Sequence, residues 1–209
     1  LKGEDAPFVM ELPPYRLPTL SGILDMTARV RAAGVETPLV LFSYYNVILQ
    51  YGPEALALRS AEAGVDGWLV VDMPAEEDEE IVPVLKKGGL HKITLIAPTT
   101  PLERGRRLMA RASGFVYYIT VKGVTGARAS LPEDLKQKLD DLRSGSDLPV
   151  VAGFGVSTPD MARAVSEHAD GVVVGSKLVQ TIAGAPDREA ALRGAGELVE
   201  KLAAPLRNG

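Results

Sequence analysis

The chain has 209 residues, of which 46% are hydrophobic and 24% charged, enough for one globular domain with a sizeable core. Its formal net charge of −4 gives no basic surface, so we expect no nucleic-acid partner. Cysteine is absent and histidine occurs twice, which excludes disulfides and argues against a metal site, and no apolar run approaches the roughly 18 residues of a membrane span.

Residues 1–20 differ from the rest of the chain because they hold four of its 15 prolines. Prolines exclude a helix here and favour an extended path. A helical pattern then begins at Thr19 or Ser21 and ends near Gly34.

From this point the sequence alternates apolar strands with amphipathic helices. The predicted strands cover residues 38–42, 65–71, 93–96, 115–120, 150–152 and 171–174, and a helix follows each. Near-continuous apolar strands of this kind form a parallel sheet whose outer face is covered by helices. We therefore expect six βα units.

One stretch near the C-terminus has the pattern of a phosphate-binding turn. The strand at 150–152 leads into Gly153, Phe154 and Gly155, and Ser157 or Thr158 then caps a helix that begins with proline. Glycines let backbone N–H groups approach a ligand, and a helix N-terminus adds unpaired donors and a positive dipole end.

A second turn of this kind ends the next strand at Gly175 and Ser176. Taken singly, each turn is more simply an ordinary βα connection that needs glycine for its geometry. Because the loops after the last two strands of a (β/α) barrel form its usual phosphate site, the spaced pair favours phosphate binding.

In parallel α/β folds, ligands bind at the carboxyl ends of the strands. There Phe42, Leu69 and Ile96 would form an apolar pocket with the phenol of Tyr117, although a core role for this tyrosine is also consistent. Asp72 stands at such an end too, and for it we favour a structural role as a cap or acceptor. The glycine-containing loop 121–128 suits a mobile lid or a plain surface connection.

Seven motifs in order resemble the tryptophan synthase alpha chain family. They are SYYN at 43–46, AGVDG at 63–67, VVDMPAEE at 70–77, APTT at 97–100, ASGFVYY at 112–118, GVTG at 123–126 and GFGVSTP at 153–159. The resemblance runs from about Thr37 to the C-terminus. It implies a (β/α)8 TIM barrel that cleaves indole-3-glycerol phosphate to indole and glyceraldehyde 3-phosphate, and passes indole to a pyridoxal-phosphate beta chain.

The resemblance also implies roles for individual residues. The substrate phosphate would lie at Gly126, Gly153, Phe154, Gly155, Gly175 and Ser176. The indole pocket would comprise Phe42, Leu69 and Ile96, with Tyr117 beside the substrate and Thr125 in the closing lid loop. The chain itself would hold no cofactor and no metal and would be cytoplasmic.

The front of the family barrel has no clear counterpart in this sequence. The two catalytic carboxylates of the family, a glutamate acid/base and an aspartate that holds the indole N–H, belong to units that would precede Thr37. About two βα units are missing, so we expect an incomplete barrel. Instead, residues 1–24 resemble a segment of ferrous iron transport protein B.

Glu11 is the one candidate for a missing carboxylate. The order Val9, Met10, Glu11, Leu12 echoes the second strand of the family, which would make Glu11 the acid/base. The aspartate-bearing loop finds no counterpart, because arginine, leucine and proline stand there.

We therefore expect residues 1–24 to form a non-barrel segment and residues 25–209 a partial barrel. The first functional hypothesis is an alpha-chain lyase that acts on a small phosphorylated substrate and whose turnover is impaired where the two carboxylates lack counterparts. The alternative is an inactive barrel fragment that binds a phosphate ligand or the beta chain. A transporter would need apolar spans after residue 24, and none follow. Because open sheet edges associate, we also expect the N-terminal segment or a homo-oligomer to close the gap.

Overall fold

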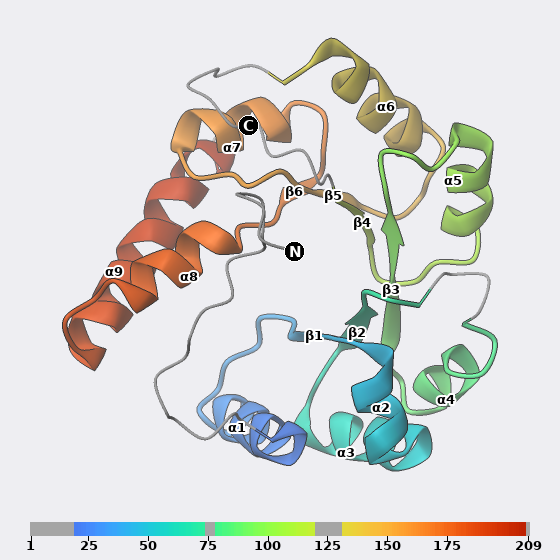
Figure 1. The fold of residues 1–209 in the computed structure, drawn as a ribbon, viewed down its shortest axis with the longest axis vertical. Helices are drawn as coiled ribbons and strands as arrows, with labels where there is room; N and C mark the ends of the chain where they lie inside the picture. Colours follow the sequence, from blue (N-terminus) through green and yellow to red (C-terminus); the bar gives the residue numbers. More distant parts are fainter. Residues whose placement is uncertain (1–18, 74–77, 120–130, 208–209) are drawn as a thin grey trace, which may run out of the picture.

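The computed structural model describes residues 19–73, 78–119 and 131–207. In these residues six strands form one parallel sheet in the order in which they follow along the chain. They are β1 (Val40–Ser43), β2 (Gly67–Val70), β3 (His91–Ile96), β4 (Val116–Ile119), β5 (Val150–Gly153) and β6 (Gly171–Val172). Figure 1 shows the sheet curled into an open barrel. The expected incomplete barrel of six βα units is confirmed.

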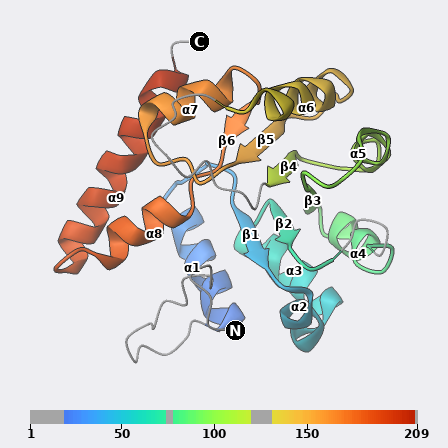
Figure 2. The ribbon, with the colours of Figure 1, turned by 45° about the horizontal axis from the view of Figure 1, so that its top comes forward.

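Helices lie on the outer side of the curled sheet, as Figure 2 shows from a second direction. They are α1 (Leu20–Ala32), α2 (Tyr45–Tyr51), α3 (Pro53–Ala63), α4 (Val82–Lys87), α5 (Leu102–Met109), α6 (Glu133–Ser144), α7 (Pro159–Ser166), α8 (Ser176–Ala183) and α9 (Arg188–Ala203). A short 3-10 helix, Ala204–Leu206, follows α9. The expected domain boundary after residue 24 falls within α1.

The segment after β1 differs from its prediction. The sequence pattern predicts one helical stretch through Ala63, whereas the structure has two helices separated at Gly52. Gly52 has a φ of +91°, which ends α2, and Pro53 has no N–H to continue it but suits the first turn of α3.

Alternate strand side chains face the helices and form most of the core. On one half of the sheet, Trp68 of β2 packs with the fully buried Leu24 and Leu56 of α1 and α3. On the other half, Tyr118 of β4 packs with Leu139 of α6. These contacts fix which way each strand faces, since neighbouring residues of a strand point to opposite sides of the sheet.

The inner side of the sheet has its own apolar cluster, centred on the buried Leu69, Ile93 and Tyr117. Phe42 pairs in register with Leu69, and Leu69 pairs with Ile93, so these three side chains lie in one row. The inner side of this row is where a (β/α) barrel binds its ligand at the carboxyl ends of the strands.

Within the described residues β1 and β6 form the two free edges of the sheet. Phe42 on the edge strand is 63% exposed, although its partner Leu69 is 4% exposed. No helix in the described residues is long and apolar enough to cross a membrane.

Candidate functional site

The glycine turn after β5 is built as the sequence predicts. Gly155 has a φ of +66° and is exposed, so a side chain there would strain the turn. Of the two candidate caps it is Thr158 that begins α7, because its hydroxyl accepts the backbone N–H of Met161 at 3.3 Å. Pro159 occupies the first turn.

Phe154 contributes to this turn in a different way from the glycines. Its side chain is 1% exposed and packs in the outer core, with its ring centroid 6.0 Å from that of Tyr118. Any contact between Phe154 and a ligand on the inner side would therefore come from its backbone.

The second turn, at Gly175 and Ser176, is better suited to an anion. Gly175 stands at the N-cap of α8 and provides no side chain to cap it, and the first turn of α8 holds no acidic residue. In α7, by contrast, the threonine hydroxyl already accepts an N–H and Asp160 adds a negative charge to the first turn. Since free N–H groups and the dipole attract anions, the N-terminus of α8 is the stronger of the two phosphate candidates.

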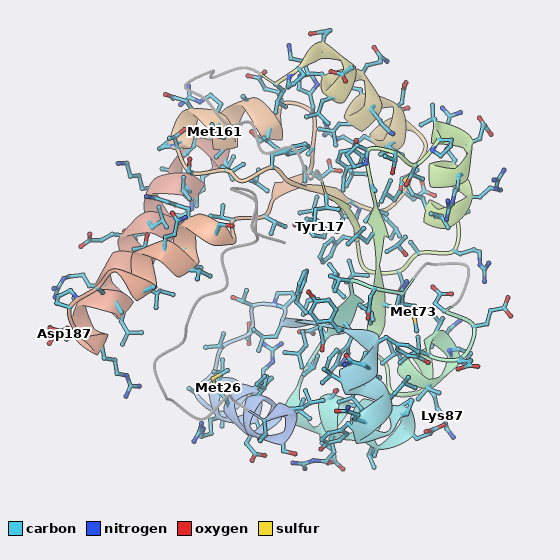
Figure 3. The ribbon with its side chains drawn as sticks, in the orientation of Figure 1. Met26, Met73, Lys87, Tyr117, Met161 and Asp187 are labelled. Atoms are coloured by element: carbon cyan, nitrogen blue, oxygen red, sulfur yellow. The ribbon has the colours of Figure 1, made fainter. Side chains whose placement is uncertain are left out.

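Tyr117 and Gly153 are in close contact on neighbouring strands. A Cβ built on Gly153 would lie 2.3 Å from Oη of Tyr117, so the ring covers the glycine. Figure 3 shows Tyr117 on the inner side of the sheet. Burial raises the pKa of this phenol above its ordinary value, so at neutral pH it can donate a hydrogen bond but cannot act as a base.

The structure brings together only part of the predicted indole pocket. Phe42 and Leu69 share the inner side of the sheet, but Ile96 is fully buried on the outer side against α5 and α6. The assignment of Ile96 to the pocket is corrected. The inward residues of β3 are Ile93 and Leu95.

This misplacement has a physical reason. The predicted strand spans only residues 93–96, of which three are apolar, so it does not reveal the alternation that separates its two sides. The outward Lys92 and Thr94 are the polar residues that distinguish the two sides. Both are buried, and Lys92 forms an ion pair with Asp78 at 3.2 Å.

Several candidates lie outside the described residues. They are Glu11, Thr125, Gly126 and the whole lid loop 121–128. Their proposed roles stay predictions.

Two polar contacts stabilise loops at the carboxyl ends of the strands. Asp72, after β2, accepts the backbone N–H of Tyr45 at 2.7 Å, which confirms the structural role favoured for it. Lys138 of α6 donates to the carbonyl oxygens of Pro98 and, at 2.8 Å, of Thr100. The contact of Lys138 joins segments about 40 residues apart and has no signal in the local sequence.

Two further features bear on what else the described part of the chain can bind. Among the described residues, no group of three or more His, Cys, Asp or Glu side chains is placed to hold a metal ion. An apolar pocket of about 200 Å³ lies on the outer side of β6, where Val172 faces Leu178 and Leu202 of α8 and α9.

The curled parallel sheet, with two glycine turns at the carboxyl ends of its last strands, defines a protein of the α/β barrel class. Comparison with known proteins identifies its family. The family profile described as "Tryptophan synthase alpha chain" matches residues 16–206, so the chain belongs to this family. A second profile, "Ferrous iron transport protein B C terminus", matches residues 1–29.

Relatives in sequence and structure agree with this assignment. The tryptophan synthase alpha chains of Geobacter sp. (strain M21) and Citrifermentans bemidjiense are 44% identical over 162 residues, or 78% of this chain. The chain spans only 60% of the length of these curated relatives.

Solved structures of alpha chains superpose closely on the described fold. The subunit from Legionella pneumophila has a TM-score of 0.79 at 35% identity, covering 90% of this chain and 70% of that one. The Pyrococcus furiosus structure described as an a2b2 complex has a TM-score of 0.81 at 33% identity, covering 91% of this chain and 75% of that one.

Proposed function

We propose that the chain binds indole-3-glycerol phosphate and takes part in its retro-aldol cleavage to indole and glyceraldehyde 3-phosphate. The observation that carries this proposal is the N-terminus of α8. Its uncapped N–H groups follow Gly175 and lie one strand away from the turn at Gly153. Family membership supports the choice of substrate.

The inner apolar row would receive the indole ring. Leu69 and Ile93 are buried beside Tyr117, and Phe42 extends the row to the edge of the sheet. The protonated phenol of Tyr117 would donate a hydrogen bond to the substrate. With the phosphate at α8 and the ring against this row, the glycerol carbons would lie between them.

The cleavage needs two proton transfers that these residues do not supply. A proton must reach C3 of the indole and another must leave the glycerol hydroxyl, so that the bond between C3 and the glycerol carbon breaks and an aldehyde forms. Glu11 is the proposed acid/base, in keeping with its place in the sequence. Loss of one positioned acid/base typically lowers the rate by about 10² to 10⁴.

A second candidate function is binding without useful turnover. The buried residues at the centre of the inner cluster, Leu69, Ile93 and Tyr117, offer one polar side-chain group, the hydroxyl of Tyr117. On this alternative the described part of the chain keeps the phosphate site and the ability to bind a beta chain. A beta chain is a proposed partner in both cases, supported by the relative from Pyrococcus furiosus that forms such a complex.

One assay separates the two candidates. Indole release from indole-3-glycerol phosphate is measured with the purified chain, with and without a beta chain, together with Glu11→Gln. Turnover that disappears in Glu11→Gln supports the lyase. Glycerol 3-phosphate binding without turnover supports the binding function.

The phosphate site is tested separately by adding one negative charge. Ser176→Asp at the N-terminus of α8 is expected to weaken glycerol 3-phosphate binding about tenfold or more, because like charges repel at the dipole end. Gly196→Asp is the matched control, since this exposed position of α9 has no described atom within 4 Å of a built Cβ. Equal affinity of the two variants would remove α8 from the site.

A further inference from the structure

The apolar pocket of about 200 Å³ beside β6 lies between that strand, α7, α8, α9 and the short 3-10 helix. Figure 1 shows these three helices grouped at the end of the sheet that β6 forms. Val172 and Val174 line the pocket, whereas Val173 between them packs against the inner cluster. The pocket and the inner apolar row are therefore on opposite sides of the sheet.

The lining of the pocket determines which chemistry it can hold. The nine described residues that line it are all alanine, valine or leucine. Ala162 and Leu202, 1% and 5% exposed, form its floor, and Val199, 53% exposed, stands at its mouth. A water held in a protein needs about two to four polar partners, and a charged ligand would lose its hydration here without gaining a hydrogen bond from any of these side chains. The lining therefore selects an uncharged apolar molecule.

The space has a physical cause in the packing of α8 against α9. A Cβ built on Gly194 would lie 3.3 Å from Cγ2 of Thr181, so the two helices cross closely at this glycine. Leu178 and Leu198, which line the pocket, lie about one helical turn beyond that crossing on α8 and α9. The close crossing fixes the helix pair, and the pocket is the space left between the helices further along.

The volume sets the size of the occupant. An engineered apolar cavity of about 150 Å³ in another protein stays dry and binds benzene. The pocket here is about a third larger, which leaves room for a second, fused ring. A rigid ring also loses less conformational freedom on binding than a flexible aliphatic chain does.

These observations point to one kind of ligand. We infer that the pocket between β6, α7, α8 and α9 is a binding site for a small uncharged aromatic molecule of the size of benzene to indole. The site lies behind the N-terminus of α8, since Val174 directly precedes Gly175 and Leu178 belongs to the first turn of the helix. The inference concerns the outer side of the sheet and does not rest on the proposed reaction.

The test follows indole binding through the methyl signals of the full 209-residue chain in solution NMR. The signals of Val174, Leu178 and Leu202 are expected to shift and to saturate as indole is added. The signals of Leu69 and Ile93 report the inner row in the same spectra. Binding at the pocket and binding at the site of the proposed function are thus measured separately, and either can fail alone.

A charge at the mouth of the pocket should weaken binding there. Val199→Asp is expected to lower the affinity for indole at the outer signals about fivefold or more, because the ligand would cover and dehydrate the carboxylate. Leu192→Asp is the matched control on the same helix, since Leu192 is 67% exposed and does not line the pocket. It should leave the affinity within about twofold.

A larger side chain should fill the pocket. Ala203→Leu is expected to lower the affinity at the outer signals about tenfold or more, while the melting temperature stays equal or rises. Ala204→Leu, at the next and exposed position, is the control and should leave the affinity within about twofold. Thermal unfolding of each variant keeps loss of folding apart from loss of binding.

Three results would overturn the inference. The first is the absence of any shift at Val174, Leu178 and Leu202 up to the solubility limit of indole. The second is equal affinity of Val199→Asp and Leu192→Asp, or shifts at the inner row alone, which would place the indole elsewhere. The third is a chain that is dimeric at micromolar concentration and that Val199→Asp makes monomeric, which would assign the pocket to a second copy.

Discussion

The phenol of Tyr117 occupies the space that a side chain on Gly153 would need. A Cβ on Gly153 would lie 2.3 Å from the hydroxyl oxygen and 2.8 Å from Cε2 of the ring. The two residues stand on adjacent strands, two positions apart in register, and the ring leans toward the carboxyl end of β5. Gly153, which opens the predicted phosphate-binding turn, thus also leaves the space that the ring of Tyr117 occupies on the inner side of the sheet.

Gly153→Ala is expected to destabilise the fold by about 1–3 kcal/mol, because the ring must move within a packed cluster. Urea unfolding measures the change. In a Tyr117→Ala background the same substitution should cost clearly less, since the clash is gone. Gly171→Ala is the control, with a nearest contact of 3.2 Å to a methyl group of Val151. Additive effects of the Gly153 and Tyr117 substitutions would contradict the argument.

Ser60→Ala tests a buried hydrogen bond in the outer core. The indole N–H of Trp68 donates to Oγ of Ser60 at 3.1 Å, and both residues are fully buried. Removing the acceptor leaves the indole N–H unsatisfied, which should cost about 1–3 kcal/mol. Trp68 is the sole tryptophan in the sequence, so its fluorescence reports both the local change and the unfolding curve. Ser144→Ala, whose hydroxyl bond is exposed, should change stability by less than about 0.5 kcal/mol.

Breaking the ion pair between Lys92 and Asp78 is expected to lower the free energy of unfolding strongly. Replacing both residues by apolar ones is expected to change it little. The side chains are 5% and 12% exposed and 3.2 Å apart. Lys92→Met alone leaves a nearly buried carboxylate and should cost about 3–5 kcal/mol, whereas Lys92→Met with Asp78→Leu should recover most of this. Chemical unfolding of the original chain, of Lys92→Met and of the double variant measures both changes. For comparison, Glu103→Gln breaks an exposed pair with Arg106 and should have little effect.

Tyr118 is expected to make the free energy of unfolding depend on pH in the alkaline range. Burial, with a smaller contribution from Asp134, raises the pKa of Tyr118 to about 12 from 10.0. The unfolded chain therefore loses this proton before the folded chain does, and stability falls as pH rises from about 10 toward 12. Unfolding free energies measured across this range should fall less steeply in Tyr118→Phe. The difference in slope between the two chains gives the contribution of Tyr118.

The sequence predicts the six strands and their parallel order because each apolar run is short, β-branched and followed by a helical pattern. It also predicts a hydroxyl cap at Ser157 or Thr158 before the proline that opens the helix, and the structure has Thr158 there. The Gly-Pro dipeptide at Gly52 signals the end of α2. The apolar residues on both sides of it follow one helical pattern, however, which is why a single helix was expected.

The prediction for Ile96 failed because the strand was expected to begin only at Ile93. Over the whole of β3 the outward Lys92, Thr94 and Ile96 alternate with the inward Ile93 and Leu95, in register with the neighbouring strands. The contact of Lys138 with the carbonyls of Pro98 and Thr100 could not be predicted from the sequence. It depends on how α6 packs against a loop that is distant along the chain.

The sequential order of the strands has a consequence for how the chain folds. Each pairing in the described sheet joins strands that are consecutive in the chain, from β1 with β2 to β5 with β6. A closed barrel also needs a contact between its first and last strands, which carries the loop-closure entropy of nearly the whole chain. The open sheet forms without that contact. Its assembly can begin at any neighbouring pair of strands and spread in both directions, because each pairing closes only the βα connection between the two strands.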